Sequence, residues 1–149
     1  MSTSGKFRVS LRVFHPTLSA DAITSEISFR TRFAHSVGAP RLTKSGNILG
    51  EVYSETDVSF AVSEKVLDTD EVLITEFIQQ TLRDLSLEAI DRFIASGGSC
   101  FFSVGTYSEG NLMCDFDASL LSKLSVHGLG LRLDFYGGPE LLPTRMANA

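Results

Sequence analysis

The segment Phe-Arg-Val-Ser-Leu-Arg-Val, at residues 7–13, is the part of the sequence on which the fold prediction rests. Its apolar and polar residues alternate, which is the pattern of a β-strand with one buried face. Near the other end of the chain, residues 129–136 read Leu-Gly-Leu-Arg-Leu-Asp-Phe-Tyr and alternate in the same way. We therefore expect a long, half-buried strand near each end of the chain.

The sequence between these two strands carries further strand signals and the start signals of helices. Shorter strands are predicted around residues 32–35, 48–54, 58–62 and 100–105. Helices are predicted over residues 20–29, capped by Ser19, and after the potential N-cap residues Asp68, Ser86 and Asp117. Asp68 is followed three residues later by Glu71, as in a capping box.

These elements predict one α+β domain over residues 1–136, a mainly antiparallel sheet with three to four helices packed on one face. The remaining residues, 137–149, contain two prolines and no periodicity, so we expect a loosely ordered C-terminal tail.

The composition is that of a globular protein, with 43% hydrophobic and 21% charged residues among 149. The N-terminus is polar and no apolar run is long enough to cross a bilayer, so we predict no membrane association. Two cysteines, Cys100 and Cys114, are too few for a disulfide scaffold or a thiolate zinc site. We therefore predict a cytoplasmic protein with free thiols.

Charge is distributed unevenly along the chain. Residues 1–50 contain seven Lys or Arg and two Asp or Glu, whereas residues 51–117 contain three and fourteen. This distribution does not favour nucleic acid as a partner, because nucleic-acid binding needs a basic surface to neutralise phosphates. It is compatible with a basic protein partner that binds the acidic part.

The pattern of apolar positions and caps resembles a bacterial family known as domain of unknown function 4279. The resemblance spans roughly residues 6–137 and is carried mainly by 7–13, by 19–27, by the acidic helix from Asp68 and by the C-terminal run from Phe116 to Tyr136. It implies a bacterial protein and supplies no catalytic residue.

Motifs for catalysis, cofactors and metals are absent from the sequence. His15, His35 and His127 stand alone, without a His or Cys at ligand spacing. Asp115 and Asp117 could hold a cation, but a helix cap at Asp117 explains that pair better. No nucleophile elbow or glycine-rich phosphate loop is present. We predict no catalytic residue, no cofactor and no metal.

Two polar groups remain as candidate binding surfaces. The first is a face for a ligand or partner, formed by polar residues of the two end strands: Arg8, Arg12, Arg132, Asp134 and Tyr136. If these strands were neighbours, Arg and Asp could pair across them. The second is a basic stretch that could bind anions or a partner: Arg30, Arg32, His35, Arg41 and Lys44. A solvated sheet face explains the first group better than a binding surface does, and an ordinary surface loop explains the second group better.

Three classes of function follow. The first is a non-catalytic protein-binding module, of the immunity or regulatory kind, with a basic protein partner. The second is a small-ligand-binding protein or an enzyme that uses the polar sheet face. The third is a structural domain that forms a homodimer through a sheet edge or a helix.

Overall fold

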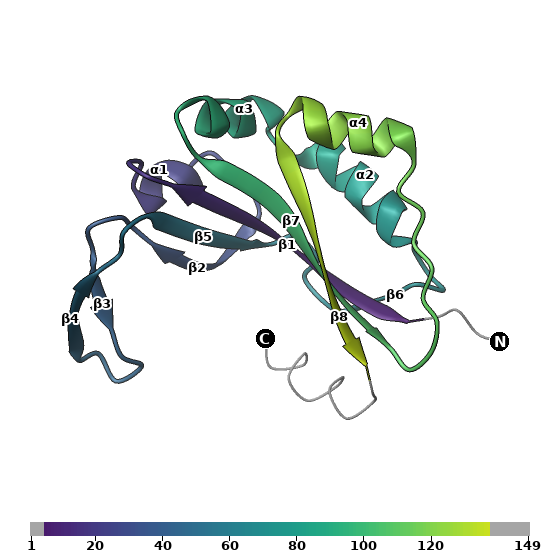
Figure 1. Ribbon diagram of the computed structural model, residues 1–149, viewed down its shortest axis with the longest axis horizontal. Coiled ribbons are helices and arrows are strands. Elements are labelled where there is room, and N and C mark those ends of the chain that lie inside the picture. The colour runs from purple at the N-terminus through teal and green to yellow at the C-terminus, as the bar shows by residue number, and fades with distance from the viewer. Residues whose placement is uncertain (1–4, 138–149) are drawn as a thin grey trace.

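The computed structural model describes residues 5–137, which fold into a curved sheet with helices along it (Figure 1). Eight strands and four helices are described. In chain order they are β1 (Lys6–His15), α1 (Ala20–Thr24), β2 (Arg30–His35), β3 (Pro40–Leu42), β4 (Ile48–Val52), β5 (Thr56–Ala61), β6 (Leu67–Asp68), α2 (Ile74–Asp84), α3 (Leu87–Ala95), β7 (Ser99–Ser108), α4 (Ala118–Val126) and β8 (Leu129–Gly137). The α+β class is therefore confirmed. The tail predicted for 137–149 lies outside the described residues, apart from Gly137 at the end of β8.

The main sheet is mixed rather than purely antiparallel. Its order is β2-β5-β1-β7-β8, and the short strand β6 pairs with the first residues of β1. The pairs among β2, β5, β1 and β7 are antiparallel, but β8 runs parallel to β7. The physical reason is the connection: α4 carries the chain back across the sheet, which is how parallel neighbours are joined.

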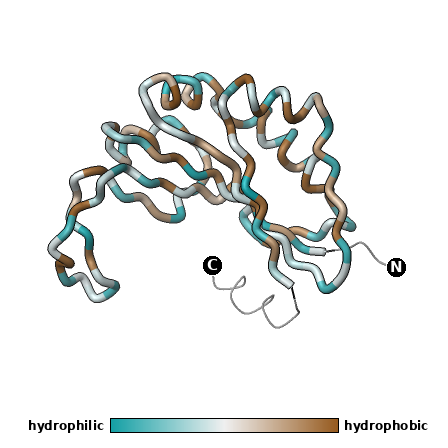
Figure 2. The backbone as a smooth tube through the Cα atoms, viewed as in Figure 1, coloured by the Kyte–Doolittle hydropathy of each residue, from teal (hydrophilic) through white to brown (hydrophobic). Residues whose placement is uncertain are grey.

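The core lies between the helices and one face of the sheet. Phe7, Val9, Leu11 and Val13 of β1 are completely buried, as the alternation predicted. They belong to one apolar cluster with buried side chains from all four helices. Figure 1 shows α2, α3 and α4 on the same side of the sheet, and Figure 2 shows hydrophobic segments in both layers. A fully buried large aliphatic side chain contributes roughly 1.5–3 kcal/mol, so this cluster carries most of the stability.

Two predicted helix starts are confirmed in atomic detail. The Ser19 side chain accepts a hydrogen bond from the backbone N–H of Ala22, and Asp117 accepts one from Leu120. Ser86 also precedes a helix, α3, although its side chain forms no capping bond.

Two helix predictions were wrong. The first helix ends at Thr24, not near residue 29, because the chain must turn to enter β2; Ile27 is nevertheless buried, outside the helix. Asp68 does not start a helix, since α2 begins only at Ile74. Instead Asp68 lies in β6, where it is the strand partner of Lys6 of β1. Its carboxylate accepts a hydrogen bond from the backbone N–H of Asp70.

Strands β3 and β4 form a separate two-stranded hairpin that projects from the edge of the main sheet (Figure 1). All of its strand residues are exposed, among them the large apolar residues Leu42, Ile48, Leu49 and Val52. The strand predicted at 48–54 is therefore confirmed as part of this hairpin.

Candidate ligand-binding site

The face of the sheet opposite the core, here called the outer face, carries Arg8, Ser10, Arg12 and Phe14 of β1. Strand pairing extends this face to neighbouring strands, because residues in register point to the same side. The odd-numbered residues of β7 and the even-numbered residues of β8 therefore join it. The predicted site residues Arg8, Arg12, Arg132, Asp134 and Tyr136 all belong to this face.

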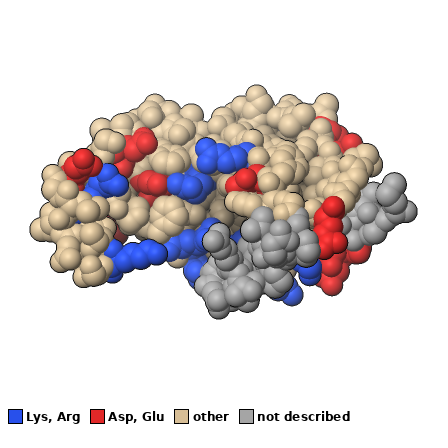
Figure 3. Space-filling view, turned by 60° about the horizontal axis from the view of Figure 1, so that its bottom comes forward, with Lys and Arg blue, Asp and Glu red and all other residues tan. Residues whose placement is uncertain are grey.

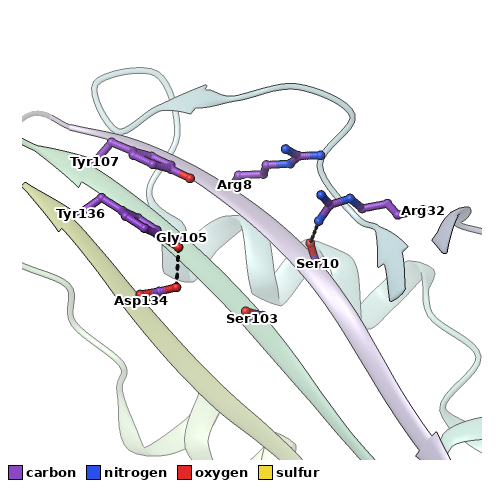
Figure 4. Close-up of a pocket in the computed structure, with 8 residues that line it drawn as sticks. All are labelled: Arg8, Ser10, Arg32, Ser103, Gly105, Tyr107, Asp134 and Tyr136. Carbon is purple, nitrogen blue, oxygen red and sulfur yellow. Dashed lines mark hydrogen bonds between the residues drawn. The ribbon is translucent and has the colours of Figure 1, made fainter. Parts of the chain in front are cut away.

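A cavity of about 200 Å³ opens on the outer face (Figure 4). It is lined from β1 and β2 by Arg8, Ser10 and Arg32, and from β7 and β8 by Ser103, Gly105, Tyr107, Asp134 and Tyr136. Three of the five predicted residues thus come together at one cavity, whereas Arg12 and Arg132 lie outside its lining.

Arg8 and Asp134 lie in one row but on strands that are not neighbours. Gly105 of β7 is in register with Arg8 on one side and with Asp134 on the other. The intervening strand places the two Cα atoms roughly 10 Å apart, twice the usual strand spacing. Among residues 5–137 neither side chain forms a salt bridge. The cross-strand Arg–Asp pair, expected if the strands were neighbours, therefore does not form.

Arg32 reaches the cavity because β2 contains a β-bulge. The register with β5 shifts between Thr31 and Phe33, which leaves Arg32 as the extra residue. Its Nη1 donates a hydrogen bond to Ser10 Oγ at 3.1 Å. Burial lowers the pKa of Arg32, and the positive charges of Arg8, Arg30 and Arg12 lower it further. The guanidinium groups around Ser10 therefore repel one another, and a bound anion would relieve this repulsion.

Two tyrosines form the wall of the cavity beside Asp134. The rings of Tyr107 and Tyr136 are stacked, with centroids 5.0 Å apart and planes 10° from parallel. Tyr136 Oη donates a 2.6 Å hydrogen bond to Asp134 Oδ2. A Cβ atom on Gly105 would lie 3.2 Å from Tyr107 Oη, so the absent side chain leaves room for this ring. Burial raises the pKa of Tyr107, so its hydroxyl stays protonated at neutral pH and can donate a hydrogen bond.

Arg12 has a structural partner instead of a place in the cavity. Its Nη2 lies 2.8 and 2.9 Å from the two carboxylate oxygens of Asp57 on β5, and both side chains are largely buried. Its guanidinium also lies 5.1 Å from the ring centroids of Phe14 and Phe33. Arg12 therefore ties β1 to β5 and β2, and its charge is neutralised internally.

Arg132 also packs against an aromatic ring. Its guanidinium carbon lies 4.5 Å from the centroid of Phe101, which stacks on Phe14 at 6.0 Å. The outer face next to the cavity is therefore a surface of arginines and aromatic rings, and Arg132 extends it on β8.

The basic stretch predicted as a second site is divided by the structure. Arg30 pairs with Glu64 and Arg41 pairs with Glu51, both at exposed positions. His35 stacks on Tyr53 with a centroid distance of 4.5 Å. Only Arg32 faces the cavity, so these residues do not form one anion-binding loop.

Ion pairs within the fold join the basic first part of the chain to its acidic middle part. Arg12, Arg30 and Arg41, from the basic first third, bind carboxylates of the acidic middle part. Arg8 and Arg32 form no such pair among the described residues, and both line the cavity. Figure 3 shows Lys and Arg side chains across this side of the molecule, with Asp and Glu among and beside them.

Other groups that could carry chemistry lie elsewhere and have structural partners. Within residues 5–137, no three His, Cys, Asp or Glu side chains are grouped so that they could hold a metal ion. His127 caps the C-terminus of α4 and pairs with Asp91. Burial raises the pKa of the Cys100 thiol to about 12, and burial with the charge of Asp115 raises that of Cys114, so both shifts disfavour the reactive thiolate.

Sequence reasoning missed the three cavity residues of β7: Ser103, Gly105 and Tyr107. A signal for them exists, because a strand, a helix and a strand in succession over 99–137 favour a parallel pair with β7 and β8 adjacent. Nothing local in the sequence shows that β7 also pairs with β1, which is what brings Arg8 to the same cavity.

The comparisons with known proteins add no relative. No family model, curated protein or solved structure matches this chain. The resemblance to the domain of unknown function 4279 family therefore stays a prediction. None of the described helices has both the length and the apolar character needed to span a membrane.

Proposed function

We propose that this chain is a non-catalytic ligand-binding protein and that its binding site is the cavity on the outer face. Arg8 and Arg32 take an anionic group of the ligand, a carboxylate or a phosphate. Tyr107 donates a hydrogen bond to the same group. The hydroxyls of Ser10 and Ser103, which also line the cavity, complete the polar surroundings.

The observation that carries this proposal is the position at one cavity of two arginines, Arg8 and Arg32, that form no salt bridge within residues 5–137. The other arginines of the first 50 residues are paired with Asp57, Glu64 and Glu51. Arg8 and Arg32 lie close enough for the charge of one to lower the pKa of the other. Holding two like charges together costs free energy, which an anion between them recovers.

The size of the cavity limits the ligand. A volume of about 200 Å³ equals that of about seven water molecules in the liquid. This is below the 300 Å³ or more of typical sites for drug-sized ligands. The ligand, or the part of it that enters the cavity, is therefore small.

The predictions of a basic protein partner and of a homodimer remain predictions. Three carboxylates of the acidic part, on the hairpin, on β5 and in the segment after β5, already pair with the chain's own arginines. This internal pairing lowers the charge available to a basic partner, and for that reason we favour the cavity.

The proposal is tested by titrating the full chain with inorganic phosphate and with butanoate at low salt, followed by NMR of the backbone amides. Shifts are expected in β1, β2, β7 and β8 around the cavity. Arg8→Gln and Arg32→Gln should each weaken binding about tenfold or more, because a hydrogen bond to a charged group contributes roughly 1.5–3 kcal/mol.

Arg41→Gln is the matched control, since it removes the same charge from the exposed hairpin. It should leave the affinity within twofold. Equal losses in all three variants would mean that the anions respond only to net charge, and shifts confined to other elements would place the site elsewhere; either result refutes the proposal.

A further inference from the structure

The cavity carries side chains of opposite charge at its two ends. Arg8 and Arg32 provide positive charge on the side of β1 and β2, and Asp134 provides negative charge on β8. Gly105 lies between Arg8 and Asp134 in the same row and contributes no side chain. Figure 4 shows the side chain of Arg8 extending away from Asp134, with β7 between the two residues.

The opposite charges stay apart because neither side chain is aimed at the other. Asp134 is held toward Tyr136 by the hydrogen bond from the tyrosine hydroxyl to Oδ2, and Tyr136 is held by its stacking on Tyr107. That hydrogen bond occupies one carboxylate oxygen, and no hydrogen bond to Oδ1 occurs within the described range. A fixed carboxylate thus faces the cavity from the side opposite the arginines.

From this arrangement we infer that the ligand is a small zwitterion, with an anionic group at Arg8 and Arg32 and an ammonium group at Asp134. The inference rests on the proposed function, because it adds a second contact to the same anion site. An anion alone would satisfy the arginines but would be repelled by Asp134. A molecule with both charges gains at both ends.

The dimensions define the class of zwitterion. The Cα atoms of Arg8 and Asp134 are separated by two strand spacings, roughly 10 Å. The Arg8 side chain extends away from Asp134, so the ligand must span at least this separation, less its contact distances to the two charged groups. Together with the cavity volume, this favours amino acids with a few carbons between the charges, and it excludes a nucleotide from lying wholly inside.

The test compares 4-aminobutanoate with butanoate, which has the same carbon chain and carboxylate but lacks the ammonium group. Both are titrated into the full chain at pH 7 and low salt, with amide NMR as the readout. The wild-type chain should bind 4-aminobutanoate at least tenfold more tightly than butanoate. In Asp134→Asn this advantage should fall below twofold, while the affinity for butanoate should stay equal or rise.

The outcomes separate this inference from the proposed function. If the wild-type chain binds both compounds equally, or if Asp134→Asn weakens both equally, the ligand is an anion only and the inference is wrong while the proposed function stands. If neither compound binds in a way that depends on Arg8, both fail. The amide spectrum of Asp134→Asn reports whether the variant is folded, and the wild-type comparison does not depend on that variant.

Discussion

The stability of the fold should depend on pH through His15, the completely buried residue at the end of β1. Its Nδ1 accepts hydrogen bonds from the backbone N–H groups of Thr17 and Leu18, at 3.1 and 3.0 Å. Nδ1 therefore carries no proton, and Nε2 donates to Ser96 Oγ at 2.8 Å. In the protonated imidazolium, the second proton would sit on Nδ1 and would point at the N–H groups of Thr17 and Leu18, which are themselves donors. Burial accordingly lowers the pKa of His15 below its ordinary value.

The sign and size follow from linkage between protonation and folding. Because the pKa is lowered in the folded state, the unfolded chain binds more protons below about pH 6.5, and stability falls as the pH falls through this range. The slope cannot exceed about 1.4 kcal/mol per pH unit for one group. Between pH 7 and pH 5.5, a His15 that stays neutral when folded costs about 1.2 kcal/mol of unfolding free energy.

The assay is urea unfolding at several pH values between 5.5 and 8, for the wild-type chain and for His15→Asn. The asparagine oxygen can accept from the same two N–H groups but does not titrate. The His15→Asn variant should be less stable than wild type at pH 7, and this difference should shrink on going to pH 5.5, by at most about 1.2 kcal/mol. Ser96→Ala is the control, because it removes the Nε2 partner and keeps the imidazole, so it should keep the pH dependence. A difference between wild type and His15→Asn that does not change with pH would refute the reasoning.

Two further predictions concern the sheet and its connections. Gly98→Ala should destabilise the fold by about 1–3 kcal/mol, because its Cβ would lie 2.8 Å from two backbone carbonyl oxygens and from the ring of His15. Gly110→Ala, which meets no atom within 4 Å, is the control in the same urea unfolding assay, and equal effects would contradict the argument. A double-mutant cycle of Arg12→Met and Asp57→Asn should give a coupling of about 1–3 kcal/mol, since the pair is largely buried. The same cycle on the exposed ion pair of the hairpin should give less than about 0.5 kcal/mol, and similar values for both pairs would show that burial does not matter here.

Local patterns predicted the core well because burial follows the period of the strand. The alternation over 7–13 identified the inner face of β1, and Ser19 and Asp117 cap helices as expected. The capping-box pattern at Asp68 failed because a distant contact competes with it. Leu67 and Asp68 pair with the first residues of β1, and the N–H of Thr69 donates to the carbonyl of Gly5. Once this backbone is used in a strand, the helix must begin later.

The candidate site was predictable only in part, because a site on a sheet depends on strand order. The sequence placed Arg8, Asp134 and Tyr136 on polar strand faces, and the structure brings these three to one cavity. The position of Arg32 depends on a β-bulge, and that of Tyr107 on a strand between the two end strands. Neither the bulge in β2 nor the position of β7 between β1 and β8 can be recognised from the residues of β1 and β8.

The contrast between Arg8 and Arg12 shows how topology decides which charge is left for a ligand. Both lie on the outer face of β1, four residues apart. Strand β5 pairs with β1 only from Ser10 to His15, so it supplies the carboxylate that neutralises Arg12. Strand β6 pairs only at Lys6 and Phe7, so Arg8 falls between the two partners and has none in register on that edge. On its other edge it faces a glycine. Within the described part of the chain, the gap in strand pairing thus leaves the Arg8 charge without a carboxylate partner beside Gly105, which is the physical basis for placing the anion there.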